Sequence, residues 1–174
     1  MKISVIIPSF NQGEFLDETL ASVFASGSTP EVILIDGGST DATLDVIRKW
    51  APKLSYWISE PDRGQADAIN KGLTKATGDV WCYINSDDLL EPKALDFVAS
   101  FFSQGDVHWL SGACTSFDEN GDCGTVIPDS ATRELDYLLP WNRPSRYVFP
   151  FSGACFMSRA LYEQLGGFDP SYHY

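Results

Sequence analysis

Basic residues are scarce in this chain of 174 residues. Only 12 Lys and Arg stand against 24 Asp and Glu, which gives a net charge of −12 at pH 7. A surface of this charge repels a phosphate backbone, so we expect no nucleic-acid partner. Any phosphate that the protein binds must be met locally, by a metal ion or by backbone amides.

Long apolar runs are also missing. The longest is far too short to cross a bilayer, and no charged-then-apolar leader precedes the first predicted strand. We therefore expect a cytoplasmic protein, with peripheral association at the inner face of the membrane left open. The four cysteines lack close paired spacing, and Cys82 and Cys155 lie in apolar runs. This pattern favours reduced, mostly structural cysteines, with metal chelation as the minor alternative.

The sequence does contain enough apolar material for an ordered core, because 44% of its residues are hydrophobic and 13% aromatic. Apolar runs at 3–8, 31–35, 54–59 and 80–84 predict four buried strands. A segment with apolar residues at helical spacing follows each run, and Pro92 suits the first turn of the fourth helix. Alternation of this kind predicts the α/β class, with a parallel sheet and right-handed crossovers.

Beyond Gly105 the pattern changes to strands without intervening helices. Residues 107–117 predict a strand, 118–121 a hairpin turn and 124–127 the returning strand. A polar, proline-broken segment at 130–146 follows, with a short helix around 134–139. An apolar run at 149–157 and a helix at 159–165 come last, so we expect a small antiparallel portion in the C-terminal half.

The most informative stretch is 79–88, where a buried strand breaks abruptly into Asn85, Ser86, Asp87 and Asp88. Adjacent carboxylates at the end of a strand repel each other and need a cation, hydrogen bonds or open solvent. A divalent cation bound through oxygen is one solution, and a polar turn capped by Asp88 is the other. In open α/β sheets, ligands bind beyond the carboxyl ends of the strands.

Five motifs occur in a fixed order along essentially the whole chain: Ser4-Val-Ile-Ile-Pro-Ser-Phe-Asn11, Ile35-Asp-Gly-Gly-Ser-Thr-Asp41, Asp62-Arg-Gly64 with Asn70-Lys-Gly72, Asn85-Ser-Asp-Asp88 and Gly166-Gly-Phe-Asp169. Together they resemble the family 2 inverting glycosyltransferases. The resemblance implies the GT-A (nucleotide-diphospho-sugar transferase) fold, a mostly parallel Rossmann-like sheet flanked by helices. It also implies transfer of a sugar from a nucleotide-diphosphate donor to a saccharide or lipid-linked acceptor.

The resemblance assigns a nucleotide-binding set, which consists of Pro8, Ser9, Phe10, Asn11, Asp36, Arg63, Asn85 and Ser86. The structural alternatives are a turn role for Asp36 and a loop or cap role for Asn11. The family's second turn more often carries two adjacent Asp residues, whereas the pair here is Asp36-Gly37. This departure leaves the identity of the base open, and the donor is expected to be a UDP- or GDP-sugar.

The resemblance also makes Asp87 the ligand of a divalent metal, Mn²⁺ or Mg²⁺, which acts as a Lewis acid on the donor diphosphate. The first position of the family's Asp-any-Asp signature is Asn85 here, so the expected metal site has one negative charge fewer. Asp88 and Asp67 are expected on the donor-sugar side. Asp88 supports the metal through water or fixes the loop, and Asp67 contacts donor hydroxyls or pairs with Lys71.

The sequence gives weaker signals for the residues that bind the acceptor. Trp141, Tyr147 and Phe149 form either an aromatic platform for the acceptor or part of the core. In the family, the general base comes from an acidic pair shortly after the last motif, and no such pair precedes Tyr174. The base is therefore expected beyond that residue; His173 is a minor candidate for a base or a metal ligand.

We therefore predict a single GT-A domain over 1–174, with a nucleotide-sugar-binding half at 1–105 and an incomplete acceptor-side half at 106–174. The expected role is synthesis of a cell-surface polysaccharide or glycolipid, with weak or absent transfer by the chain as it stands. The alternative is a non-catalytic nucleotide-sugar-binding module or partner subunit, which the Asn85 departure favours. A sugar nucleotidyltransferase is disfavoured because Ser9–Gly13 contains no basic, Gly-rich loop. Peripheral membrane association and a homodimer are compatible with this assignment.

Overall fold

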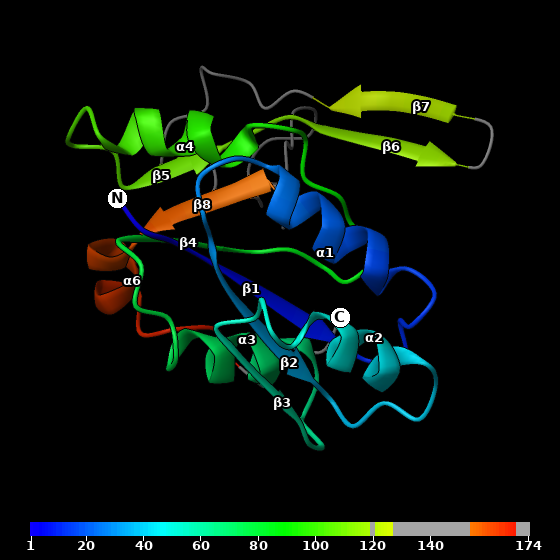
Figure 1. Cartoon of the computed structure of the whole chain (residues 1–174). Helices are drawn as coiled ribbons and strands as arrows, with labels where there is room; N and C mark the ends of the chain where they lie inside the picture. Colours follow the sequence, from blue (N-terminus) through cyan, green and yellow to red (C-terminus); the bar gives the residue numbers. More distant parts are fainter. Residues whose placement is uncertain (119–120, 127–153, 170–174) are drawn as a thin grey trace, which may run out of the picture.

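The computed structural model describes residues 1–118, 121–126 and 154–169 of the chain. Its centre is a six-stranded sheet of order β3-β2-β1-β4-β8-β5, drawn in Figure 1. The parallel strands are β1 (Ile3–Ser9), β2 (Glu31–Asp36), β3 (Tyr56–Ser59) and β4 (Val80–Tyr83). Next to β4 lies β8 (Cys155–Ser158), which runs antiparallel to it, and β5 (Trp109–Ser111) pairs antiparallel with β8. The predicted α/β class, with a mostly parallel sheet and a small antiparallel part, is confirmed.

Helices cover both faces of this sheet (Figure 1). The first face carries α1 (Leu16–Ala25), α2 (Thr43–Trp50) and α4 (Ala94–Phe102), and the second carries α3 (Gln65–Leu73) and α6 (Arg159–Leu165). Side chains of β1 alternate between the two cores, with Val5 and Ile7 in one and Ile6 in the other. Burial on both faces explains why β1 is a nearly continuous apolar run.

Two of the differences between predicted and observed elements have a clear structural cause. Pro92 lies before α4 and not in its first turn, because Lys93 adopts a left-handed conformation with φ of 66° just ahead of the helix. The strand predicted at 107–117 is divided into β5 and β6 (Cys114–Asp118). β5 pairs with β8, whereas β6 pairs with β7 (Gly121–Val126) in a separate ribbon. The chain changes its pairing partner between these strands, which the apolar pattern alone does not reveal.

Glu31 ties together the amino ends of three parallel strands. Its carboxylate accepts hydrogen bonds from Lys2 Nζ (2.6 Å), Ser4 Oγ (2.6 Å) and the Thr77 backbone N–H (2.7 Å). Burial alone would raise the pKa of Glu31, but these hydrogen bonds outweigh it and lower the pKa to about 2. This end of the sheet is closed by contacts within the protein.

The Gly166–Asp169 motif packs against the core between the sheet and α3 and α6, which contains Ile6. Gly166 ends α6 in a left-handed conformation with φ of 80°. Asn70 on α3 then clamps Phe168, since its Nδ2 donates to the Phe168 carbonyl (2.7 Å) and its Oδ1 accepts from the Phe168 N–H (2.9 Å). The Phe168 ring packs edge-on against Trp81 on β4. In this structure the motif therefore has a packing role.

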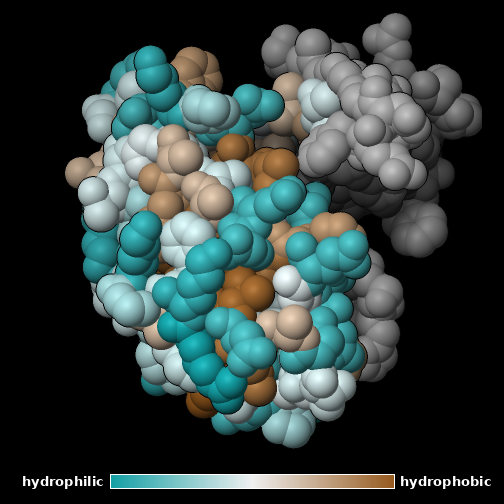
Figure 2. Space-filling model, turned by 45° about the vertical axis from the view of Figure 1, so that its right-hand side comes forward, coloured by the Kyte–Doolittle hydropathy of each residue, from teal (hydrophilic) through white to brown (hydrophobic). Residues whose placement is uncertain are grey.

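Several sequence predictions lie outside the described residues: the helix around 134–139, the aromatic residues Trp141, Tyr147 and Phe149, and His173. Within the described part, no helix has the length and apolar character needed to cross a bilayer. Cys82, Cys114 and Cys155 are free thiols, as expected. Figure 2 shows one face of the molecule, on which hydrophobic residues reach the surface in small patches between hydrophilic ones.

Candidate functional site

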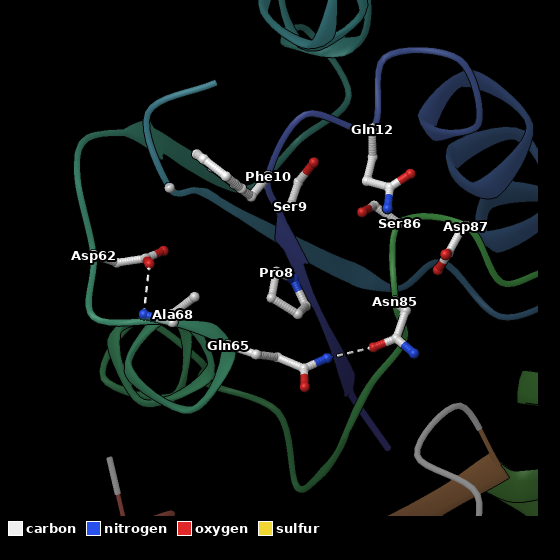
Figure 3. A pocket seen from close by; sticks show the side chains of 12 residues that line it. Pro8, Ser9, Phe10, Gln12, Asp62, Gln65, Ala68, Asn85, Ser86 and Asp87 are labelled. Atoms are coloured by element: carbon white, nitrogen blue, oxygen red, sulfur yellow. Dashed lines mark hydrogen bonds between the residues drawn. The ribbon is translucent and has the colours of Figure 1, made fainter. Parts of the chain in front are cut away.

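A cleft of about 580 Å³ opens at the carboxyl ends of β1 and β4, next to the start of α3 (Figure 3). Its lining residues are Pro8, Ser9, Phe10, Gln12, Gly37, Asp62, Gly64, Gln65, Ala68, Asn85, Ser86 and Asp87. Parallel strands direct their loops to this edge of a sheet, which is where open α/β proteins bind ligands. The cleft is large enough for a ligand of nucleotide size.

The loops after β1 and β2 are hydrogen-bonded to each other. Asn11 has a left-handed backbone with φ of 52°, which Asn tolerates better than most residues. Its N–H donates to Ser39 Oγ (2.8 Å), and its Oδ1 accepts from the Thr40 N–H (2.9 Å). Asn11 therefore joins the two loops and is not among the residues that line the cleft.

Asp36 lies at the end of β2 and is fully buried. Its Oδ2 accepts from the Ser39 N–H (3.0 Å), the Gly38 N–H (3.2 Å) and Ser59 Oγ (2.5 Å). Its Oδ1 accepts from Ser39 Oγ. Both oxygens are thus engaged within the protein, and Asp36 shapes the turn. A nucleoside could reach this carboxylate only by sharing an acceptor that is already in use.

The β1 loop presents two groups to the cleft. Ser9 is only 4% exposed, and its Oγ has no hydrogen-bond partner among the described residues. A buried hydroxyl without a partner is costly, so this oxygen is suited to bind a polar ligand atom or water. Phe10 is 60% exposed, although it lines the cleft. The loop therefore offers a polar contact beside an open aromatic ring.

Asn85–Asp88 form a turn after β4, in which the Asp88 N–H donates to the Asn85 carbonyl (3.2 Å). Asn85 Nδ2 donates to Asp88 Oδ2 (2.9 Å), and Asn85 Oδ1 accepts from Gln65 Nε2 (2.6 Å). Ser86 is buried, and its carbonyl accepts from Thr19 Oγ1 on α1 (2.9 Å). The turn is thereby fixed to both α1 and α3.

Two neighbouring carboxylates end this turn. Asp87 is exposed at the cleft, and Asp88 is partly buried beside it. Burial, and then the charge of Asp87, raise the pKa of Asp88 despite its hydrogen bond from Asn85. A divalent cation would relieve this repulsion, so the donor set suits an oxygen-preferring metal. Among the described residues, no group of three or more His, Cys, Asp or Glu side chains could hold a metal ion.

Arg63 and Asp67 pair with each other and are not among the cleft-lining residues. Arg63 Nη2 donates to Asp67 Oδ1 (2.9 Å), and Lys71 Nζ lies 3.8 Å from Asp67 Oδ2. The Arg63 contact is the main reason why the pKa of Asp67 is lowered. Of the two roles expected for Asp67, the structure displays pairing, with Arg63 in the turn before α3 and with Lys71 on α3.

Asp62 lines the cleft and was not singled out as a site residue from the sequence. Its Oδ1 accepts from the Gly64 N–H (2.8 Å). A Cβ added at Gly37 would lie 2.8 Å from Asp62 Oδ2, so glycine at position 37 makes room for this carboxylate. The available sequence signal for Asp62 was the pair Asp36-Gly37, where the family more often has two adjacent Asp residues. Because position 37 carries no acidic side chain, a carboxylate from the next loop can take its place. Gln12, Gly37, Gly64 and Ala68 were also missed.

The sheet order, the cleft and the acidic turn define a GT-A type of α/β protein. Solved structures support this fold. TarS of S. aureus in complex with UDP has a TM-score of 0.74 and 24% identity, over 98% of this chain and 51% of that one. A mannosyltransferase from Pyrobaculum calidifontis in complex with GDP-Man and Mn²⁺ has a TM-score of 0.69 and 23% identity, over 98% and 48%.

The family is defined by sequence. The family model described as glycosyl transferase family 2 matches residues 4–166, and the chain belongs to that family. An uncharacterized glycosyltransferase of Mycobacterium tuberculosis is 40% identical over 96% of this chain and 62% of its own length. A PGL/p-HBAD biosynthesis glycosyltransferase of Mycobacterium bovis is 37% identical over 58% of this chain and 41% of its own. The chain spans 34 to 62% of the length of the first curated relatives.

Proposed function

We propose that this domain binds a nucleotide-diphosphate sugar in the cleft together with Mn²⁺ or Mg²⁺. The whole protein then transfers the sugar, with inversion, to a saccharide or lipid-linked acceptor. The observation that carries the proposal is the adjacent pair Asp87 and Asp88, at the edge of a cleft where Ser9 Oγ has no hydrogen-bond partner among the described residues. A strongly acidic protein binds a diphosphate best where a cation offsets the repulsion.

The two walls of the cleft contact different parts of the donor. Pro8, Ser9 and Phe10 form the nucleoside side, where the exposed Phe10 ring stacks on the base and Ser9 Oγ meets a ribose or phosphate oxygen. Asp62 accepts a hydrogen bond from a ribose hydroxyl or the base. Asn11 and Asp36 hold the loops in place around this pocket. Arg63 contacts the donor only after leaving Asp67.

The diphosphate lies at the opposite wall, by the turn after β4. Asp87 would ligate the cation, and Asp88 would hold it directly or through water. A bound cation would supply the positive charge that stabilises the diphosphate leaving group. With one or two protein carboxylates, the site matches the way Mg²⁺ is commonly bound alongside substrate phosphates.

Inverting transfer proceeds in one displacement. An acceptor hydroxyl oxygen attacks the anomeric carbon from the face opposite the diphosphate, and a new C–O bond forms. The bond from that carbon to the diphosphate breaks, and its electron pair goes to the diphosphate oxygen. The hydroxyl proton passes to a carboxylate base.

The relatives bear on the substrate classes. The neighbouring structures contain UDP, UDP-GlcNAc or GDP-Man, and one also contains Mn²⁺. The mycobacterial relatives named for PGL/p-HBAD biosynthesis favour a role in making a cell-envelope glycolipid. We therefore keep a UDP- or GDP-sugar as the donor and a saccharide or lipid-linked molecule as the acceptor.

Calorimetric titration of UDP and GDP, with and without Mn²⁺, tests the proposal. We expect one nucleotide to bind more tightly with Mn²⁺, and Asp87→Ala to remove this gain, at a cost of about tenfold or more in Kd. Asp45→Ala removes an equal charge from an exposed site on α2 and serves as the matched control. Failure of the folded protein to bind either nucleotide, or an unchanged metal effect in Asp87→Ala, would overturn it.

A further inference from the structure

Gln65 and Asn85 connect the two walls of the cleft. Gln65 begins α3 and Asn85 follows β4, and both line the cavity. Gln65 Nε2 donates to Asn85 Oδ1 at 2.6 Å, which Figure 3 draws as a dashed line. Gln65 is exposed, so water could replace this contact, yet the side chain reaches across the cleft to make it.

Asn85 uses both ends of its side-chain amide in this arrangement. Its Oδ1 accepts from Gln65 Nε2, and its Nδ2 donates to Asp88 Oδ2 at 2.9 Å. The reversed amide would place Oδ1 against the Asp88 carboxylate, and two acceptors repel. Donor and acceptor groups therefore alternate along the side chains of Gln65, Asn85 and Asp88.

We propose that Gln65 is a positioning residue for the metal-binding turn. It orients Asn85, which in turn holds Asp88 beside Asp87 before a cation and diphosphate arrive. This inference rests on the proposed function and goes beyond it, because it gives a residue on α3 control over a turn that follows β4.

The same chain of hydrogen bonds gives a reason for Asn at position 85. An Asp there could accept from Gln65, but it would have no proton to donate to Asp88. It would also place a third carboxylate beside Asp87 and Asp88. Asn85 thus gives up a charge and gains a donor that holds the neighbouring carboxylate in place.

The test separates positioning from direct nucleotide contact. The quantity to measure is the metal gain, the ratio of nucleotide Kd without Mn²⁺ to Kd with Mn²⁺, by calorimetry. Gln65→Ala is expected to lower this gain about fivefold, which is what one lost hydrogen bond amounts to, with the metal-free Kd little changed. Gln65→Glu should lower it at least as far, because a carboxylate repels Asn85 Oδ1. Gln164→Ala, an exposed glutamine on α6, is the matched control.

A double-mutant cycle tests whether the two residues act as one unit. Asn85→Ala should lower the metal gain, and Gln65→Ala combined with Asn85→Ala should lower it no further. Additive effects would overturn the inference. So would a Gln65→Ala variant that weakens binding equally with and without Mn²⁺, since that result identifies Gln65 as a nucleotide contact.

A second measurement needs neither nucleotide nor metal. In NMR spectra of the free protein, Gln65→Ala should shift the side-chain amide signal of Asn85, while Gln164→Ala should leave it in place. An unchanged signal in Gln65→Ala would overturn the inference. If the unsubstituted protein binds neither UDP nor GDP, the proposed donor site fails and the role in metal binding fails with it; the NMR result then tells whether the hydrogen-bonded chain itself exists.

Discussion

The two ends of the same parallel sheet treat their carboxylates in opposite ways. At the amino end, Glu31 receives hydrogen bonds from Lys2, Ser4 and Thr77, and its pKa falls to about 2 although burial opposes this. At the carboxyl end, burial and the neighbouring Asp87 raise the pKa of Asp88. The protein compensates Glu31 with several hydrogen bonds, whereas the one from Asn85 does not offset the burial of Asp88 and the charge of Asp87.

Asp36 shows that a carboxylate at the carboxyl end of the sheet can also be fully hydrogen-bonded within the protein. It ends β2 near the cleft, but its oxygens accept hydrogen bonds from Gly38, Ser39 and Ser59. In its degree of compensation Asp36 resembles Glu31 and not Asp88. The number of hydrogen bonds that a carboxylate receives therefore separates Asp88 from Glu31 and Asp36 more sharply than location does.

The largest effect is expected for Asp36→Ala. The substitution leaves the Ser39 N–H, the Gly38 N–H and the Ser59 hydroxyl without their acceptor in a buried turn. We expect the free energy of unfolding to fall by about 4 kcal/mol, as measured by urea denaturation. Asp45→Ala, on the exposed face of α2, should change it little. A loss below about 1 kcal/mol would show that Asp36 does not hold the turn.

Glu31→Gln should have the next largest effect, and one that depends on pH. A carboxyl pKa lowered from 4.5 to about 2 contributes on the order of 3 kcal/mol to folding. Because the pKa is lowered, this stability is present above pH 4.5 and is lost as the pH falls toward 2. Urea denaturation should therefore show a wide gap between the two proteins at pH 7 and a narrow one near pH 2.5. A gap of constant size would contradict the ionic role of Glu31.

Much of the fold was predictable because its signals are local. The run Ile3–Pro8 is apolar at every position but one, and it forms the central strand β1. The antiparallel insertion of β8 between β4 and β5 could not be read from the runs. The neighbours of β8 in the sheet are determined by pairing between residues far apart in sequence, such as Trp81 with Met157.

The site was predictable only in part, for a similar reason. The motifs placed Pro8, Ser9, Phe10, Asn85, Ser86 and Asp87 at one cleft, where the structure also has them. They could not show that Asp36 is enclosed by its own turn, because one of its partners, Ser59, ends β3. Pairing of Arg63 with Asp67 likewise depends on which competing partner lies nearest once the helix forms.

The smallest effect concerns Asp87→Asn in the protein without metal. The pKa of Asp88 should fall toward its ordinary value and stay above it, because the charge of Asp87 is removed while burial remains. A raised carboxyl pKa means that folding is weakened as the pH rises through it, so the variant should be slightly more stable at pH 7, by less than about 1 kcal/mol.

NMR titration of the Asp88 carboxyl carbon measures this shift, and Asp106→Asn, an exposed change after α4, is the control. An unaltered Asp88 pKa in Asp87→Asn would mean that the two carboxylates do not sense each other. The expected result makes the contrast with Glu31 quantitative. Loss of the charge at residue 31 destabilises the fold, whereas loss of the charge at residue 87 relieves a repulsion within the folded protein.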